Sequence, residues 1–301
     1  MDILVTGATG QLGRALVPAL LRKGARVSVL ARDPARARAL FPDCPALAGD
    51  VLSDNLGLPG SFRPDALYHL AGDTDLGSAG AARVRAVNLD GTANAVAFCL
   101  RNSVGRLSCA GTAYTAEGRN AYEVSKLEAE RLVASCRVPH KTVFKIGILV
   151  SGGEPAAPEG ALFRFVKGIA WALSSFPHGA PAFRIKGRPA ARLNLLQVDH
   201  AAARMADEER SGTFWLTHPS PPSLGDLAEW VGEAFNAVIK FEDDFRMTQA
   251  EAAFHRAAGS FLPYLRGGDL PSDLPGVPPV DRALVRAVAL TALEEAGRRR
   301  A

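Results

Sequence analysis

The sequence predicts an α/β fold in which a doubly wound parallel sheet is joined to a smaller C-terminal lobe. Two observations lead to this prediction. Apolar, strand-like runs alternate with helix-like segments through the first half of the 301 residues, as in parallel sheets whose strands are connected by helical crossovers. The first run ends in a glycine-rich turn at residues 7–13, and such a turn between a strand and a helix is typical of nucleotide-binding units.

The expected elements give this Rossmann arrangement in chain order. The strands and the returns of the chain to the sheet are predicted at residues 3–6, 26–31, 66–70, 106–110, 142–150, 193–199 and 214–216. Helices at 223–235 and 282–298 flank a Pro/Gly-rich stretch at 263–279. We therefore assign residues 1–150, with a return at 190–217, to a nucleotide-binding domain, and residues 151–189 and 218–301 to a small substrate-binding lobe.

Each glycine of the first turn has a mechanical role. Gly7 permits the turn itself, Gly10 lets phosphates approach the backbone, and Gly13 lets the following helix lie close to the strand. The backbone N–H groups at the start of that helix then point at a pyrophosphate.

A second informative stretch is the helix-like segment at residues 121–132, which contains Tyr122 and Lys126 one turn apart on the same face. An ammonium beside a tyrosine hydroxyl favours the phenolate and lowers the pKa of the tyrosine from about 10. A tyrosine tuned in this way can exchange a proton with a substrate oxygen.

Several motifs in this order resemble the extended short-chain dehydrogenase/reductase family, which includes the NAD-dependent epimerases and dehydratases. Besides the glycine turn and the Tyr122–Lys126 pair, they lie at residues 49–51, 69–72 and 88–92. Residues 111–114 and 120–126 are more similar to the subgroup that contains thioester reductases and fatty acyl reductases. The resemblance implies the cofactor-binding residues Gly7, Thr9, Gly10, Gln11, Leu12, Gly13, Arg32, Asp50, Val51, Ala71, Gly72, Asn88, Tyr122 and Lys126.

The same resemblance implies three catalytic residues. Thr112 would orient a substrate carbonyl, Tyr122 would donate the proton, and Lys126 would lower the pKa of Tyr122. Because the separation of Thr112 and Tyr122 along the sequence is short for the family, Ser108 is kept as an alternative to Thr112. The chain also has Lys145–Ile146 where the family commonly has Arg-Pro.

The choice between NADP and NAD depends on where the second strand ends. If it stops at Ala31, then Arg32 faces the ribose and can accept the 2′-phosphate of NADP. If the register slips by one residue, Asp33 takes that place and NAD is favoured. We expect NADP, with NAD as the alternative.

The expected reaction is reduction of a ketone or aldehyde, with an acyl thioester as a further substrate class, on a largely apolar small molecule. Its apolar pocket would be lined by aromatic and aliphatic residues of the segment between loops at 151–160 and 177–181, and of the segment after it: Phe163, Phe165, Ile169, Trp171, Phe176 and Phe183. The same residues can instead form the core of the lobe.

Two other functions stay open. A sugar-nucleotide epimerase or dehydratase would use Arg164, Arg184, Arg188 or Arg192 for a diphosphate, although Ala113 argues against dehydration because the dehydratases have an acidic residue there. A non-catalytic NADP-binding regulator would keep the fold and lose the chemistry.

Composition narrows the remaining classes. The 35 basic and 31 acidic residues are too balanced for a nucleic-acid footprint, and no apolar run is long enough to span a membrane. The four cysteines lack a CxxC pair and the six histidines lack ligand spacing, so no metal is expected. The first strand begins almost at residue 1, from which we expect no signal peptide and a cytoplasmic location. The expected partner is a small-molecule substrate, with a homodimer left open.

Overall fold

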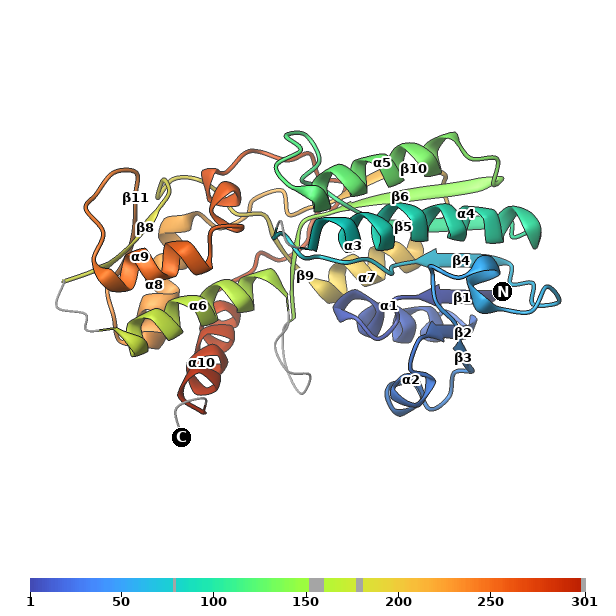
Figure 1. Ribbon diagram of the computed structural model, residues 1–301, viewed down its shortest axis with the longest axis horizontal. Coiled ribbons are helices and arrows are strands. Elements are labelled where there is room, and N and C mark those ends of the chain that lie inside the picture. Colours follow the sequence, from blue (N-terminus) through green and yellow to red (C-terminus); the bar gives the residue numbers. More distant parts are fainter. Residues whose placement is uncertain (78–79, 152–159, 177–180, 299–301) are drawn as a thin grey trace. The chain divides into compact units, whose positions relative to one another are not determined.

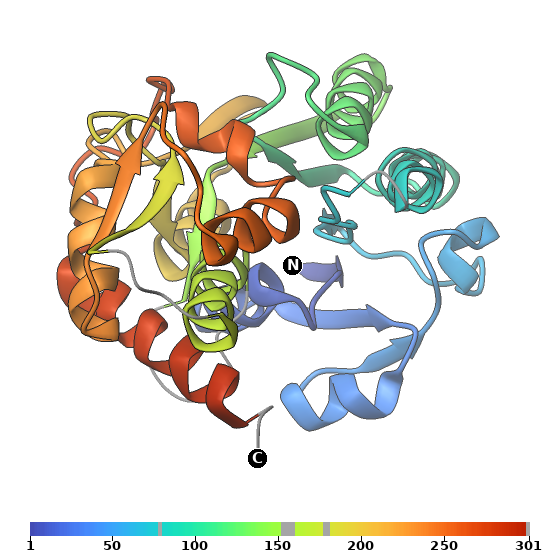
Figure 2. The same ribbon diagram turned by 60° about the vertical axis from the view of Figure 1, so that its left-hand side comes forward.

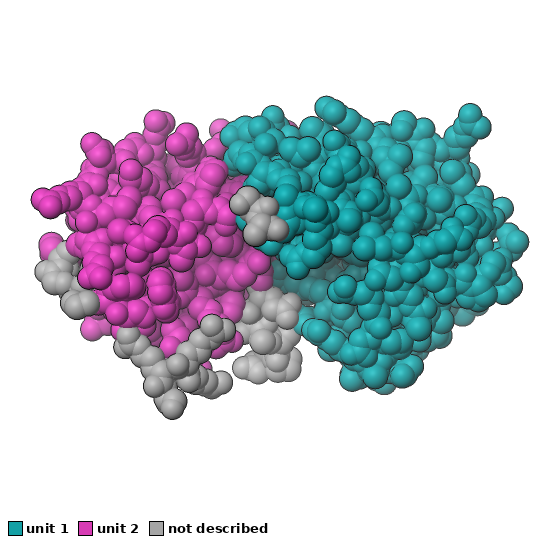
Figure 3. All heavy atoms as spheres, in the orientation of Figure 1, with its two compact units in different colours: residues 1–147, 198–216, 272–274 teal, residues 148–197, 217–271, 275–301 magenta. Residues whose placement is uncertain are grey.

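The computed structural model describes residues 1–77, 80–151, 160–176 and 181–298 (Figure 1). The chain divides into two compact units (Figure 3). Unit 1 comprises residues 1–147, 198–216 and 272–274, and unit 2 comprises residues 148–197, 217–271 and 275–301. The return to the first unit therefore begins at residue 198, whereas the sequence placed it at 190. Most of the loops expected at 151–160 and 177–181 lies outside the described residues.

Unit 1 is built on a seven-stranded sheet with the order β10-β6-β5-β4-β1-β2-β3. Every pair of neighbours in it is parallel. Its strands are β1 (Asp2–Thr6), β2 (Arg26–Ala31), β3 (Ala46–Ala48), β4 (Ala66–His69), β5 (Arg106–Thr112), β6 (His140–Ile146) and β10 (Gly212–Leu216). The order reverses beside β1, which confirms the doubly wound α/β class.

The helices of unit 1 cover both faces of this sheet (Figure 2). On one side α1 packs against α7, and on the other α4 packs against α5. The helical elements are α1 (Gln11–Arg22), α2 (Pro34–Leu40), η1 (Asp54–Gly57), α3 (Ala81–Arg85), the π-helical η3 (Ala86–Asp90), α4 (Gly91–Arg101), α5 (Ala121–Ser135) and α7 (Val198–Asp207).

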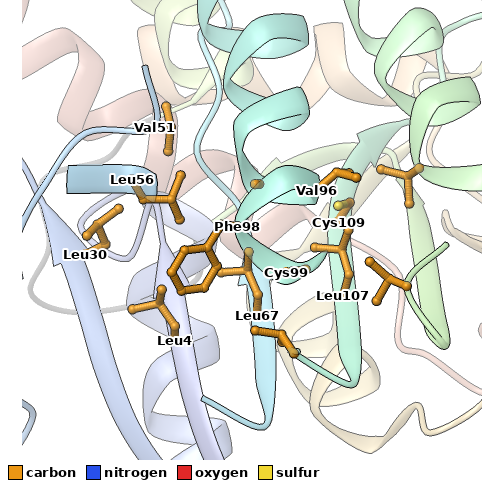
Figure 4. Close-up of a cluster of buried hydrophobic side chains, with 14 of the residues drawn as sticks. Leu4, Leu30, Val51, Leu56, Leu67, Val96, Phe98, Cys99, Leu107 and Cys109 are labelled. Atoms are coloured by element: carbon orange, nitrogen blue, oxygen red, sulfur yellow. The ribbon is translucent and has the colours of Figure 1, made fainter. Parts of the chain in front are cut away.

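The core beneath α4 shows why these strands are apolar on both sides. Leu4, Leu67 and Leu107 come from three neighbouring strands and are fully buried around Phe98 and Cys99 of α4 (Figure 4). Parallel strands that are covered on both faces have no solvent side, so their sequences are nearly continuous apolar runs instead of alternating patterns.

One predicted strand is two strands in the structure. The β-branched run at residues 142–150 breaks at Gly147, so that β6 ends at Ile146 and β7 (Ile148–Val150) begins after it. β6 pairs with β5 and β10 in unit 1, whereas β7 pairs with β9 (Leu195–Gln197) in unit 2. β-branched residues favour both strands equally, so the run itself does not show which sheet each half joins. Only Gly147 marks the break.

In its described residues, unit 2 combines two small parallel sheets with four α-helices. Its elements, besides β7 and β9, are β8 (Phe183–Lys186), β11 (Ile239–Glu242), α6 (Ala161–Ser175), α8 (Leu224–Phe235), α9 (Gln249–Ala257), η4 (Leu262–Arg266) and α10 (Arg282–Arg298). β8 pairs with β11. At the centre, Phe254 of α9 meets the rings of Phe165 and Phe183 edge-on, with centroids 5.3 and 5.6 Å apart, a favourable arrangement of aromatic quadrupoles.

None of the helices that the structure describes is long and apolar enough to span a bilayer.

A buried carboxylate joins α7 to the strand that follows it. Glu208 is 2% exposed and pairs with the guanidinium groups of Arg204 and Arg210, and it also accepts the Arg210 backbone N–H at 2.9 Å. Both arginines lie over the ring of Phe214 in β10. The hydrogen bonds from Arg210, above all, lower the pKa of Glu208 to about 2.

This cluster predicts an acid-sensitive contribution to stability. A carboxylate with a lowered folded-state pKa stabilises the protein above its ordinary value near 4.5, and the contribution is lost as the pH falls towards 2. Glu208→Gln should therefore lower the free energy of unfolding by about 2 kcal/mol at pH 7, and the difference from wild type should shrink between pH 5 and pH 2.5 in urea titrations. Glu209→Gln, at the exposed neighbour, is the control. A difference that stays constant across this pH range would contradict the assignment.

Candidate functional site

The glycine turn between β1 and α1 is shaped by contact with the end of β4. Gly7 has φ +70°, and a Cβ there would lie 2.5 Å from the backbone nitrogen of Ala71. A side chain at Gly13 would lie 2.4 Å from the carbonyl oxygen of Ala8. Both positions therefore require glycine, the first for the turn and the second for the close approach of α1.

Gly10 differs from the other two glycines, and its setting fits a bound pyrophosphate. The nearest atom to a Cβ at Gly10 is the Gly7 carbonyl oxygen at 3.4 Å, an ordinary contact, so packing in the protein does not explain the glycine. As the N-cap of α1, Gly10 supplies no side-chain hydrogen bond, and the first turn of α1 contains no acidic residue. The helix N-terminus thus presents backbone N–H groups without a competing carboxylate, as an anion site requires.

The residue that directly follows β2 is Arg32 and not Asp33. β2 ends at Ala31, and the exposed Arg32 comes directly after it. The carboxylate of Asp33 is engaged locally, because it caps α2 by accepting the backbone N–H groups of Ala35 and Arg36 at 3.0 and 3.1 Å. This is the register in which the sequence favours NADP.

The family motif at residues 49–51 lies beyond the end of β3. Asp50 accepts the Leu52 backbone N–H at 3.0 Å, while the Val51 side chain is buried against Gly91, where an added Cβ would lie 3.0 Å away. The Val51 carbonyl accepts a hydrogen bond from Asn94 of α4 at 2.8 Å.

Gly72, Asn88 and Lys126 converge at one point beyond the carboxyl end of β4. A Cβ at Gly72 would lie 3.0 Å from Lys126 Nζ and 3.1 Å from Asn88 Oδ1. Lys126 Nζ donates to the carbonyl oxygen of Ala110 in β5 at 2.9 Å. Asn88 is fully buried and holds Asp73 from both sides, accepting its N–H at 2.8 Å and donating to its carbonyl at 3.0 Å.

The structure also brings Thr112 and Tyr122 together. Their side chains share a hydrogen bond, and Thr112 is the last residue of β5. Ser108 lies four residues earlier in that strand, where its hydroxyl is bonded to Tyr68. Of the two hydroxyls kept open by the sequence, Thr112 is therefore the one beside Tyr122.

The pKa values of Tyr122 and Lys126 differ from what the sequence predicts. Burial raises the pKa of Tyr122; the Thr112 hydrogen bond lowers it by less, and the nearby Glu123 adds a small further increase. Burial also lowers the pKa of Lys126, from 10.5 to about 8. The expected lowering of the tyrosine pKa by Lys126 is therefore not seen: both groups are desolvated, and the ammonium donates to the Ala110 carbonyl.

Lys145 occupies the position where the family commonly has arginine, and its contacts explain its burial. Its ammonium donates to Glu130 of α5 and to Thr115, both at 2.9 Å, and lies 4.8 Å from the centroid of the Trp215 ring. Lys145 therefore ties β6 to α5 and to the loop before α5, within unit 1.

In unit 2 most of the residues proposed for an apolar pocket form the core. Phe163, Ile169 and Phe183 are buried, and Phe165 packs on Phe254 and Phe261. The apolar cavity beside α6 has a volume of only about 20 Å³, roughly the space for one water molecule. Trp171 is exposed and packs edge-on against Phe176.

The four arginines considered for a diphosphate have partners within unit 2. Arg184 pairs with the fully buried Glu251 and Arg188 with Asp243. Arg192 donates to the Pro221 carbonyl, and Arg164 lies over the ring of Phe261. Arg184 is the most constrained, because Glu251 receives its backbone N–H as well as its guanidinium.

Across the described ranges, no three His, Cys, Asp or Glu side chains gather in a way that would hold a metal ion.

The fold and these contacts define a dinucleotide-binding unit with a Thr–Tyr–Lys group at the carboxyl ends of β4 and β5. The model of the NAD-dependent epimerase/dehydratase family matches residues 3–169. The chain belongs to this family. None of the curated protein sequences matches it, and the nearer resemblance to the acyl reductases is not confirmed.

Solved structures with the same fold include three bacterial 4-epimerases. The UDP-glucose 4-epimerase of Thermotoga maritima, with UDP-glucose, has a TM-score of 0.67 and 16% identity, covering 100% of this chain and 99% of its own. The Thermus thermophilus UDP-glucose 4-epimerase, in complex with NAD, has a TM-score of 0.65 and 19% identity, and the match covers 97% of this chain and 99% of that one. The UDP-Glc/GlcNAc 4-epimerase of Campylobacter jejuni has a TM-score of 0.66 and 15% identity, and the match covers 98% of this chain and 99% of that one.

We expect the buried ammonium of Lys126 to lower the stability of the folded protein. Because the folded-state pKa of Lys126 is lowered to about 8, the penalty of holding its charge is fully present below pH 8 and is relieved as the pH rises towards 10.5. Lys126→Met should raise the free energy of unfolding at pH 7 by about 1–2 kcal/mol, with a smaller gain at pH 9.5, in chemical denaturation.

The control is Lys141→Met, which removes a lysine that donates to the Cys136 carbonyl at the other end of α5. It should leave stability unchanged or slightly lower. If Lys126→Met unfolds at a lower denaturant concentration than wild type at pH 7, the burial of the ammonium is not a net cost.

Proposed function

We propose that this chain catalyses reversible hydride transfer at a carbon that carries the oxygen of a small-molecule substrate. The observation behind the proposal is the group formed by Thr112, Tyr122 and Lys126, with Thr112 hydrogen-bonded to Tyr122 and Lys126 held by Ala110. A bound nicotinamide dinucleotide would accept or supply the hydride. The glycine turn at residues 7–13 and Gly72 are the places that fit it.

Each residue then has one task in the reductive direction. The raised pKa of Tyr122 keeps its hydroxyl protonated at neutral pH, so that it can donate the proton to the developing alkoxide. Thr112 orients the same oxygen. In the oxidative direction Tyr122 takes the proton back, and Lys126 supplies positive charge beside it when protonated.

As the net reaction we propose epimerisation of a nucleotide sugar, in which a carbinol is oxidised and then reduced from the other side without net change of cofactor. The support is membership of the epimerase/dehydratase family and the fold shared with 4-epimerases. Ala113 beside Thr112 argues against the dehydratase branch.

One observation favours a second candidate, net carbonyl reduction with NADPH. β2 ends at Ala31, Arg32 is exposed directly after it, and Asp33 is engaged as the cap of α2. An arginine in this place can accept the 2′-phosphate of NADP. We therefore propose NADP as the preferred cofactor for either reaction.

A substrate screen separates the two reactions. Purified protein is incubated with nucleotide sugars, with apolar ketones and aldehydes, or with acyl thioesters, while cofactor absorbance and product composition are followed. Epimerisation predicts a new nucleotide sugar with no net change in cofactor. Stoichiometric oxidation of NADPH with a ketone, aldehyde or thioester would establish reduction instead, and no turnover in any panel despite cofactor binding would favour a non-catalytic regulator.

Variants in the same assay test the chemistry. Tyr122→Phe should lower turnover by roughly 10²- to 10⁴-fold with cofactor binding retained. Thr112→Ala should lower it less, whereas Ser108→Ala is the matched hydroxyl control, because Ser108 is bonded to Tyr68 away from Tyr122. Unchanged turnover in Tyr122→Phe, or a larger loss in Ser108→Ala than in Thr112→Ala, would refute these roles.

Cofactor titration tests Arg32. NADPH should bind more tightly than NADH, and Arg32→Ala should weaken NADPH binding by roughly tenfold, as expected for one lost charge-assisted contact, while NADH binding stays nearly unchanged. Arg38→Ala, at an exposed arginine in the last turn of α2, is the control. A native preference for NADH would show that NAD is the cofactor and would leave the fold assignment intact.

A further inference from the structure

His69, the last residue of β4, has hydrogen bonds at both ring nitrogens. It is 2% exposed. Its Nδ1 lies 2.9 Å from the hydroxyl of Thr6 at the end of β1, and its Nε2 lies 3.2 Å from the hydroxyl of Thr92 in α4. Two hydroxyls can each donate or accept, so the distances alone leave the tautomer undetermined.

The other bonds of Thr92 and Thr6 fix the position of each hydrogen. The Thr92 hydroxyl donates its single hydrogen to the Asn88 carbonyl at 2.6 Å, so it accepts from His69 and the proton of the ring lies on Nε2. Nδ1 is then bare and accepts the hydroxyl hydrogen of Thr6, whose oxygen receives the Ala71 N–H at 3.3 Å. Every donor has one acceptor, and the bonds run in one direction from Thr6 to Asn88.

The ring also keeps this tautomer over a wide pH range. Burial, with a further contribution from the positive charge of Lys126, lowers the pKa of His69 to about 3. The imidazole is therefore neutral well below pH 7, and its bonding does not switch near neutral pH.

The chain of bonds ends at the π-helical turn that carries Asn88. η3 (Ala86–Asp90) is the wide turn between α3 and α4, and π-turns within helices are frequently found at functional sites. From this turn the Asn88 side chain donates to Ser125 Oγ at 3.1 Å, and Ser125 Oγ donates to the Tyr122 carbonyl at 2.9 Å. Asn88 thus bridges η3 and the first turn of α5.

We propose that His69 is a positioning residue: as a neutral imidazole protonated at Nε2, it holds the π-turn through Thr92 and so presents Asn88 to Ser125 and the start of α5. Both of its ring nitrogens are engaged by Thr6 and Thr92, so in this proposal it acts through Thr92 and Asn88. The effect on turnover rests on the proposed function, whereas the hydrogen-bond arrangement does not.

The first test uses the wild-type protein and needs no substrate. Imidazole 15N chemical shifts of histidine-labelled protein should show His69 neutral and protonated at Nε2 from pH 5 to pH 9, with the signal assigned by its loss in His69→Gln. Protonation at Nδ1, or a titration within this pH range, would overturn the proposal.

The second test follows the Asn88 side-chain amide by hydrogen exchange. Thr92→Val removes the hydroxyl with little change in shape and should accelerate exchange of this amide by roughly tenfold. His69→Leu should do the same, and His69→Gln, which retains an N–H near the position of Nε2, should restore slow exchange. His140→Leu, at the exposed first residue of β6, should have no effect. Slow exchange in Thr92→Val would overturn the proposal even if His69→Leu does not fold.

Turnover separates positioning from folding. With a substrate from the screen, His69→Leu should lower kcat by roughly tenfold or more with the KM for cofactor unchanged, and His69→Gln should recover most of it. Equal activity in His69→Leu and wild type would overturn the positioning role, while failure of all proteins to turn over would refute the proposed function and leave the hydrogen-bond tests to stand.

Discussion

The reversal of strand order beside β1 is the constraint on which the site depends. Because β1 lies between β2 and β4, its carboxyl end meets that of β4, and ligands of open α/β sheets bind at such a switch point. Here the contact is tight enough that Gly7 tolerates no side chain against Ala71. The Thr6–His69 hydrogen bond joins the same two strand ends, so the nucleotide turn and the polar site are held by one junction.

Around this junction the interior of unit 1 contains polar side chains, whereas its core beneath α4 is apolar. Asn88 and His69 are buried, and each of their polar side-chain groups has a hydrogen-bond partner. Lys126 is buried too, with the carbonyl of Ala110 as the acceptor for its ammonium. Polar groups in a low-dielectric interior are expensive when unpaired and rigid when fully paired. The arrangement therefore gives up stability at Lys126 and gains fixed geometry at Asn88.

The surroundings of Lys126 and Lys145 are features of the site that the spacing of residues in the sequence does not predict. The spacing of Tyr122 and Lys126 correctly places both on α5, but the strong desolvation that raises one pKa and lowers the other depends on what covers them. Likewise, Lys145 reads as a departure from the family pattern, whereas its pairing with Glu130 and Thr115 depends on residues from α5 and the loop before it.

The sequence by itself determined the fold class and the strand–turn–helix at residues 7–13, because apolar periodicity and glycine act over a few neighbours. It left the last residue of β2 open by one position, and the structure ends that strand at Ala31. The sequence also left open whether Phe163 and Ile169 line a pocket or form a core. Tertiary structure decided that they are core, that Thr112 and not Ser108 meets Tyr122, and that the run at 142–150 divides between two sheets at Gly147. These outcomes depend on contacts between distant segments, and a local pattern carries no information about which segment will lie opposite.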